Sequence, residues 1–185
     1  MYRIIPLNLG EYKIYPTAAY YKATPEEEDV GFVYSAFALE DTETGEIVMV
    51  DAGVVPENEY EQYRSVFHPS SLVPGAPSLR QVLAEKGIDP LKVKTVILTH
   101  LHMDHCYNVD LFANAKIYVQ KKELQHAVTP TPVERSSYQV AALPGLPCWM
   151  KAWGVLRRLT ETEKSWTVYP YGLLRGTRRA LSLFS

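Results

Sequence analysis

Residues 93–105 read VKTVILTHLHMDH, and this stretch is the most informative about the fold of the chain. Its apolar beginning, VKTVIL, is typical of a buried strand, and the strand leads directly into a run of histidines and an aspartate. Side chains two apart in an extended chain face the same way, so His100 and His102 can converge on one ion. Asp104 and His105 follow the bend and can reach a second ion nearby.

Imidazole nitrogen and carboxylate oxygen are the ligands of a catalytic Zn²⁺ or a similar metal. Two ions roughly 3.5 to 4 Å apart can share a bridging hydroxide, because binding lowers the pKa of water towards about 7. The alternative is that the three histidines pair with backbone groups in a polar loop. Three histidines and an aspartate at this spacing, directly after a strand, favour the metal site.

Strands and helices alternate along the rest of the chain, which indicates an α/β (α+β) fold class. Alternating apolar residues predict strands, and capped periodic segments predict helices. The expected strands are residues 2–16, folded as a hairpin about residues 9–11, then 31–39, 46–50, 93–98 and 115–120. The expected helices are residues 57–67, 78–86, 104–112 and 121–128, and residues 129–147 contain four prolines and are expected to form a long loop.

Two of these predictions are specific enough to check residue by residue. The turn at residues 41–45 joins two strands into a hairpin that delivers Asp51 to the end of the second strand. Ser78 is a plausible N-cap for the helix that follows it, and Gly87 is a plausible stop signal.

Composition excludes several classes of protein. The 185 residues are 46% hydrophobic and 22% charged, which is enough for one globular domain with a core. The net charge of −2, without a long basic block, argues against nucleic acid or anionic lipid as a partner. No segment reaches the roughly 18 to 20 apolar residues that span a bilayer. Two cysteines, Cys106 and Cys148, and a start without signal-peptide character predict a reduced, cytoplasmic protein.

Two motifs carry a resemblance to a known family. Residues 99–105 (THLHMDH) are similar to the signature of the metallo-β-lactamase superfamily, and residues 48–53 (VMVDAG) are similar to its earlier strand-aspartate-glycine motif. The resemblance covers roughly residues 1–153. Within the superfamily, residues 94–128 and the proline-rich loop after them are most similar to the N-acyl homoserine lactonase group.

The resemblance implies an αββα sandwich with two metals, zinc or other divalent ions, at one rim between its sheets. It assigns His100 and His102 to the first metal, Asp104 and His105 to the second, with Asp104 as a catalytic residue and Asp51 close behind them. It implies that hydroxide on the metals attacks a small-molecule lactone or ester, such as the acyl homoserine lactones of quorum quenching. A glyoxalase-II-like thioesterase or another esterase of the same fold is the alternative.

The second half of the family's site is missing from this sequence. The family uses a third histidine, a bridging aspartate and a last histidine, yet no histidine follows His126 and no aspartate follows Asp110. His68 and His126 are expected to be surface residues. We therefore expect the N-terminal half of the sandwich, which binds metal weakly, has little activity and exposes an apolar sheet face that favours a homodimer. A non-catalytic remnant is the alternative from outside the enzymes.

The chain changes character near residue 153. Residues 154–185 hold six basic and two acidic residues, against 13 and 19 upstream. We interpret this tail as read out of frame, since one set of codons for residues 175–184 regroups into PGHSPGSQSV, which resembles the family's third-histidine segment. Residues 160–169 regroup likewise into DGDREIVDGV. The alternative is a genuine, divergent C-terminus, which the poor periodicity of the tail disfavours.

Overall fold

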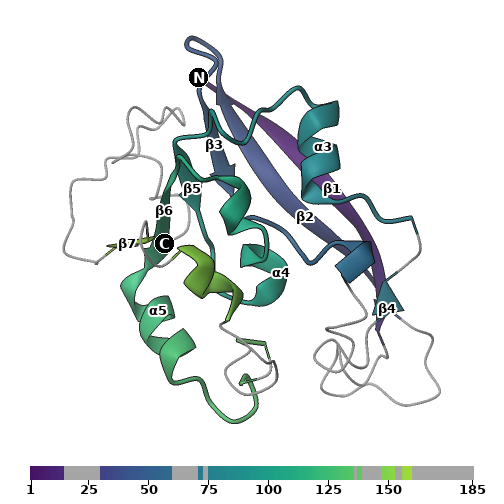
Figure 1. Cartoon of the computed structure of the whole chain (residues 1–185), viewed down its shortest axis with the longest axis vertical. Coiled ribbons are helices and arrows are strands. Elements are labelled where there is room, and N and C mark those ends of the chain that lie inside the picture. Colours follow the sequence, from purple (N-terminus) through teal and green to yellow (C-terminus); the bar gives the residue numbers. More distant parts are fainter. Residues whose placement is uncertain are drawn as a thin grey trace.

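The computed structural model describes residues 1–14, 30–59, 71–72, 75–135, 137–138, 147–152 and 156–159. These residues form a mixed sheet of seven strands in the order β4-β1-β2-β3-β5-β6-β7 (Figure 1). The strands are β1 (Tyr2–Ile14), β2 (Val30–Asp41), β3 (Ile47–Val50), β4 (Ser71–Leu72), β5 (Thr95–Ile97), β6 (Lys116–Gln120) and β7 (Leu156–Leu159).

The helices flank this sheet. The α-helices are α3 (Leu79–Glu85), α4 (Met103–Cys106) and α5 (Lys121–Val128), and the short 3-10 helices are η2 (Val109–Leu111) and η3 (Cys148–Ala152). Helix α3 contacts β1, and α5 contacts β6 and β7 towards the other end of the sheet (Figure 1). Within the described ranges, no helix has the length and apolarity that crossing a membrane requires.

The direction of the strands decides where the two sequence motifs meet. Strands β1, β2 and β3 are antiparallel neighbours, whereas β3, β5, β6 and β7 run parallel to one another. The last residues of β3 and β5, Val50 and Ile97, are paired across the sheet. Because parallel strands end at the same edge, Asp51 after β3 lies beside the histidine-rich loop after β5.

One face of the sheet forms the main hydrophobic core together with the helices. Leu7 of β1, Met49 of β3 and Val96 of β5 contribute to this core, and Leu79 and Leu83 of α3 pack in the same cluster. All five side chains are almost completely buried. Each contributes about 1.5 to 3 kcal/mol relative to an exposed position, so this layer holds α3 on the sheet.

The opposite face of the sheet is also apolar. Leu39, Val48 and Ile97 form a second cluster on it, and all three side chains are buried. Ile4 pairs with Leu39 across β1 and β2, and its side chain is 65% exposed, while that of Phe37 is 39% exposed. An exposed apolar sheet face was expected. Ile4 and Phe37 are exposed as expected, whereas the side chains of the second cluster are buried.

Several predicted elements are confirmed. The hairpin of β2 and β3 closes through a hydrogen bond from the Gly45 amide to the Asp41 carbonyl, at 2.7 Å. Helix α3 begins with a capping box in which Ser78 and Gln81 bond each other reciprocally, and Gly87 follows its C-terminus. The strand at residues 116–120 and helix α5 lie where the pattern predicts them.

Two predicted elements differ from the structure, the hairpin at residues 2–16 and the helix at residues 104–112. Residues 2–14 form one long strand rather than a hairpin, because β1 pairs with β2 on one side and β4 on the other. The turn-like residues 9–11 mark only a shift of register between Asn8 and Glu11. The helix expected at residues 104–112 is divided into α4 and η2.

Two further predictions concern segments that the structure describes only in part, namely the helix at residues 57–67 and the tail after residue 153. Residues 57–59 form a 3-10 turn, and the rest of the helix expected at 57–67 is not described. The described ranges contain one sheet and no second one. Strand β7 lies beyond residue 153 and pairs in parallel with β6, and residues 160–185 are outside the description.

Candidate metal centre

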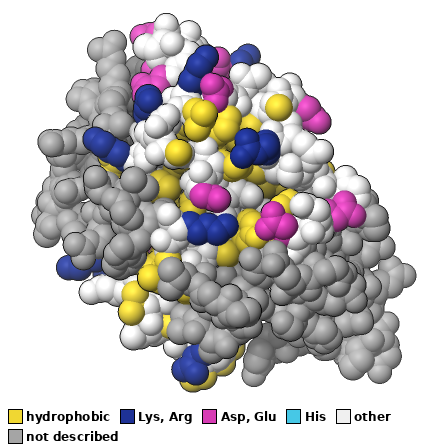
Figure 2. Space-filling model, in the orientation of Figure 1, with side chains coloured by type: hydrophobic (Ala, Val, Ile, Leu, Met, Phe, Trp, Pro, Cys, Tyr) yellow, Lys and Arg dark blue, Asp and Glu magenta, His cyan; other side chains and the backbone are white. Residues whose placement is uncertain are grey.

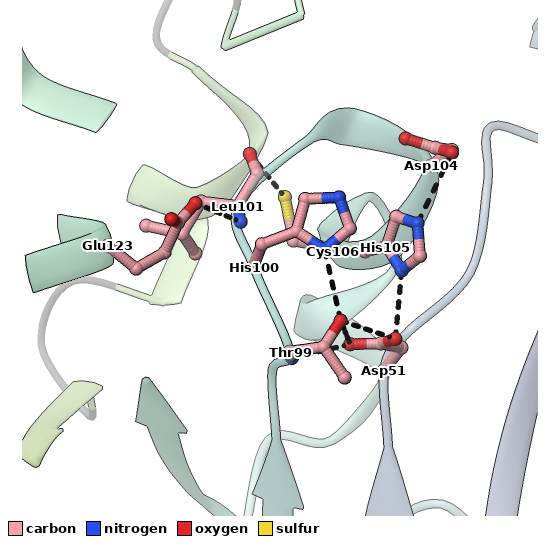
Figure 3. Close-up of polar contacts among 8 residues, drawn as sticks. All are labelled: Asp51, Thr99, His100, Leu101, Asp104, His105, Cys106 and Glu123. Atoms are coloured by element: carbon pink, nitrogen blue, oxygen red, sulfur yellow. Dashed lines mark hydrogen bonds and ion pairs between the residues drawn. The ribbon is translucent and has the colours of Figure 1, made fainter. Parts of the chain in front are cut away.

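Asp51 lies at the base of the site, between the ends of β3 and β5 (Figure 3). Its φ of 63° is in the left-handed region that side chains other than glycine rarely adopt. The buried carboxylate accepts hydrogen bonds from the Thr99 amide at 2.8 Å and from the Thr99 hydroxyl at 2.9 and 3.0 Å. These bonds hold the start of the histidine-rich loop against β3.

Backbone contacts fix α4 on the segment after β3. The amide of Ala52 donates to the carbonyl of His105 at 2.7 Å. The side-chain amide of Asn108 donates to the carbonyls of Ala52 and Val54, both at 2.9 Å. Since each contact joins residues more than 50 positions apart, tertiary structure rather than helix propensity holds this four-residue helix in place.

His105 lies between two carboxylates. Its Nδ1 atom is 2.8 Å from Oδ2 of Asp51, and its Nε2 atom is 3.4 Å from Oδ2 of Asp104 (Figure 3). Burial lowers the pKa of His105, but the hydrogen bonds with Asp104 and Asp51 outweigh it and raise this pKa to about 10. Burial also raises the pKa of Asp104, and the contact with His105 prevails and lowers it. The two carboxylates thus favour positive charge at this point.

The other two histidine rings lie against each other and against His105. The ring centroids of His100 and His102 are 4.5 Å apart, and those of His100 and His105 are 3.9 Å apart. The Nδ1 atom of His100 is 3.0 Å from the Thr99 hydroxyl. All four predicted ligands therefore come from one loop and the start of α4, as Figure 3 shows for three of them.

His100 and His102 have the chemistry that a metal ligand needs. The Nε2 atom of His102 is buried and has no hydrogen-bond partner in the described structure. Burial, the largest influence on both, lowers the pKa of His100 and of His102. Both are therefore neutral near pH 7, and neutral imidazole is the form that binds metal.

The donor set fits a divalent ion, but the donors are not arranged around a common point. No group of three or more His, Cys, Asp or Glu side chains in the described ranges is placed to hold an ion. The rings instead contact one another. An ion at this site would separate rings that now touch, and it would give the buried Nε2 atom of His102 a partner.

Other polar residues support the loop, and the sequence pattern did not single them out. Thr99 contacts both Asp51 and His100. Glu123, in the first turn of α5, accepts a hydrogen bond from the Leu101 amide at 2.8 Å (Figure 3). The only available signal for Thr99 was its place directly before the first histidine, and no signal in the sequence connects Glu123 with residue 101.

The two histidines outside the motif lie elsewhere. His126 of α5 is partly exposed, its Nε2 atom is 2.9 Å from Oε2 of Glu134, and its ring meets that of Tyr138 edge-on. His68 lies outside the described residues.

Tyr107 joins α4 to two other segments. Its hydroxyl donates to Glu59 at 2.6 Å, and the ammonium group of Lys151 in η3 lies 4.3 Å from the centre of its ring. The same ammonium donates to the Tyr107 carbonyl at 3.2 Å and lies 3.7 Å from Asp110. These contacts hold η3 against the helix that carries two of the predicted ligands.

The described surface shows no single-sign charge field on the face drawn in Figure 2. Basic and acidic side chains lie near one another there, with apolar side chains between them. An extended basic surface would be needed to follow a phosphate backbone. The surface thus agrees with the low net charge of the sequence.

Two features of the sheet are typical of the metallo-β-lactamase class of fold. Asp51 follows β3, and His100, His102, Asp104 and His105 follow the parallel neighbour β5. The sequence model of the Metallo-beta-lactamase superfamily matches residues 30–169, and the chain belongs to this superfamily. The family predicted from residues 99–105 and 48–53 is confirmed.

The matches to individual relatives cover only part of each protein. The chain is 48% identical over 44 residues to N-acyl homoserine lactonase AttM of Azorhizobium caulinodans, a match covering 24% of this chain and 17% of that lactonase. The fold of this chain is similar to that of an N-acyl homoserine lactone hydrolase with N-hexanoyl-L-homoserine at its catalytic metal centre. The TM-score is 0.59 at 19% identity, over 84% of this chain and 58% of that one. The fold is also similar to that of AidC, a dizinc quorum-quenching lactonase (TM-score 0.58, 13% identity, 86% and 58%). The chain thus spans little more than half the length of either structure.

Proposed function

We propose that this chain derives from a metal-dependent hydrolase that opens a lactone ring, of the acyl homoserine lactone type. The observation that carries the proposal is the gathering of the predicted ligands, His100, His102, Asp104 and His105, at the edge of the sheet above Asp51. The relatives support the substrate class, because AttM and AidC are both lactonases.

The residues of the site have separate roles in this proposal. His100 and His102 would hold one divalent ion, and Asp104 and His105 a second, with zinc as the expected metal. Two such ions, when bound, supply a nucleophile by lowering the pKa of water and stabilise negative charge on the carbonyl oxygen. Asp51 accepts a hydrogen bond from Nδ1–H of His105 and so leaves Nε2 of that ring for the metal.

The ligand set of the present chain is incomplete under this proposal. The lactonase pattern requires further histidine and aspartate ligands, and the sequence offers no histidine after His126 and no aspartate after Asp110. We propose that residues 1–153 are the authentic part of the domain and that residues 154–185 are read out of frame. Two observations count against a break as early as residue 154: β7 (Leu156–Leu159) pairs with β6, and the superfamily model matches as far as residue 169. Weak metal binding and little turnover follow, because coordination strength grows with the number of ligands held in place.

The nucleotide sequence of codons 150–185 tests the reading frame. A second frame that spells Pro-Gly-His, followed by an aspartate and a histidine, supports the proposal. A second frame without these residues contradicts it. The restored chain is then the right material for assays of turnover.

A substrate panel separates the candidate reactions. The present chain and the restored chain are loaded with zinc or manganese and assayed with N-hexanoyl-homoserine lactone and with a glutathione thioester. Turnover of the lactone alone supports the proposal, whereas thioester turnover favours a glyoxalase-II-like enzyme. Full turnover by the present chain contradicts the incomplete ligand set, and no turnover by the restored chain favours a non-catalytic remnant.

We further propose a reducing, cytoplasmic setting and a small-molecule substrate. Cys106 and Cys148 are both buried, and neither forms a disulfide. The exposed side chains of Ile4 and Phe37 on the sheet are among the exposed apolar groups that would support a homodimer.

A further inference from the structure

A second set of contacts reaches the histidine-rich loop from the side opposite Asp51. The carboxylate of Glu123 accepts two hydrogen bonds at the same oxygen, one from the Leu101 amide and one from the Tyr138 hydroxyl, both at 2.8 Å. Leu101 lies between the two histidines assigned to the first metal. Helix α5 and the proline-rich loop after it therefore meet at the backbone between these ligands.

Tyr138 also contacts one of the ligands directly. Its ring centroid is 4.6 Å from that of His102, and the two rings meet edge-on at 74°. Tyr138 is only 4% exposed, so its ring cannot turn away without leaving a buried space. The His102 ring that it holds is the one whose buried Nε2 atom has no partner in the described structure.

We propose that Glu123 and Tyr138 are positioning residues that hold His102 as a metal ligand. The inference rests on the proposed metal site and deepens it. Glu123 fixes the backbone between His100 and His102, and Tyr138 fixes the His102 ring, so the entropy of ordering this ligand is lost on folding rather than on metal binding. Neither residue is among the proposed metal ligands.

Two variants separate the hydrogen bond from the ring contact. Tyr138→Phe removes the hydroxyl and keeps the ring on His102, whereas Tyr138→Leu removes both. Glu123→Gln keeps an oxygen at the position that accepts both bonds and removes the charge, so it weakens both bonds. Tyr118→Phe on β6 and Glu85→Gln at the end of α3 are matched controls outside this network.

Direct titration with Co²⁺ up to millimolar concentration is the measurement, because the visible spectrum of Co²⁺ reports both affinity and ligand geometry and the titration detects the weak binding expected of this chain. We expect affinity to fall about tenfold in Tyr138→Phe and Glu123→Gln, and further in Tyr138→Leu, which is the range found when groups behind a ligand are removed. The double variant Tyr138→Phe/Glu123→Gln should lose less than the two single losses combined, since the two residues share one bond. The controls should bind as the unmodified chain does.

A metal-free measurement keeps the inference testable by itself. The His102 ring proton signals should shift in Tyr138→Leu and stay nearly unchanged in Tyr138→Phe, because the neighbouring ring is lost only in the first. Cobalt binding by the unmodified chain with unchanged affinity and spectra in all three variants overturns the positioning role alone. Failure of the unmodified chain to bind cobalt overturns the proposed metal site and this inference together.

Discussion

The Nδ1 atom of His105 lies 2.8 Å from Oδ2 of Asp51, although 54 positions separate the two residues in the chain. The contact exists because β3 and β5 are parallel neighbours that end at the same edge. Asp51 holds a backbone conformation that is unusual for any residue but glycine.

Replacement of Asp51 should destabilise the fold. Asp51→Ala removes the acceptor for the Thr99 amide, the Thr99 hydroxyl and His105, and alanine is strained at a φ of 63°. We expect a loss of about 2 to 3 kcal/mol in the free energy of unfolding, measured with urea. Asp51→Asn keeps an acceptor and tolerates this backbone, so it should lose about 1 kcal/mol. Equal stability of Asp51→Ala and the unmodified chain would contradict this account of the contacts.

Gly53 should be sensitive to the smallest substitution. Its φ is +63°, and an added Cβ atom would overlap the buried side chain of Leu9. Gly53→Ala should therefore destabilise by about 2 to 4 kcal/mol, from backbone strain and overpacking together. Gly45 has a similar φ of +71° but open space around it, so Gly45→Ala isolates the strain at about 1 kcal/mol. Thermal unfolding of both variants measures the difference, and equal losses would refute the overlap.

The bond between Tyr107 and Glu59 should stabilise the arrangement of α4. Tyr107→Phe removes a 2.6 Å hydrogen bond to a carboxylate and keeps the ring under Lys151. We expect a loss of about 1 to 2 kcal/mol in the free energy of unfolding. Tyr118→Phe is the matched control and should lose less than about 0.5 kcal/mol. A loss in the control as large as that in Tyr107→Phe would show that the effect is not specific to this contact.

The cap of α3 gives a prediction that is independent of the site. Ser78→Ala removes the oxygen that accepts from the Gln81 amide, and we expect a loss of about 1 kcal/mol. Ser78→Thr keeps the hydroxyl and should lose less. Circular dichroism during urea unfolding measures both. A loss in Ser78→Thr as large as that in Ser78→Ala would argue against the cap.

Much of the site's environment was predictable because its signals are local. The apolar run at residues 93–98 and the spacing of His100 and His102 lie within a dozen residues, and strand pairing then places Asp51 beside them. The hairpin at residues 2–16 was mispredicted, because the turn signal at residues 9–11 is local while the pairing of β1 with β4 is not. The same reason explains why the bond between Glu123 and Leu101, 22 positions apart, had no sequence signal.

Zinc binding by His100→Ala/His102→Ala, measured by calorimetry on the present chain and on the frame-restored chain, tests the central claim most directly. His68→Gln is the control, because it changes a histidine outside the motif. We expect the present chain to bind zinc weakly and the restored chain to bind it more tightly. In each chain the double variant should lose more than about tenfold in zinc affinity, and the control should lose none. Zinc uptake that is the same with and without His100 and His102 would contradict it.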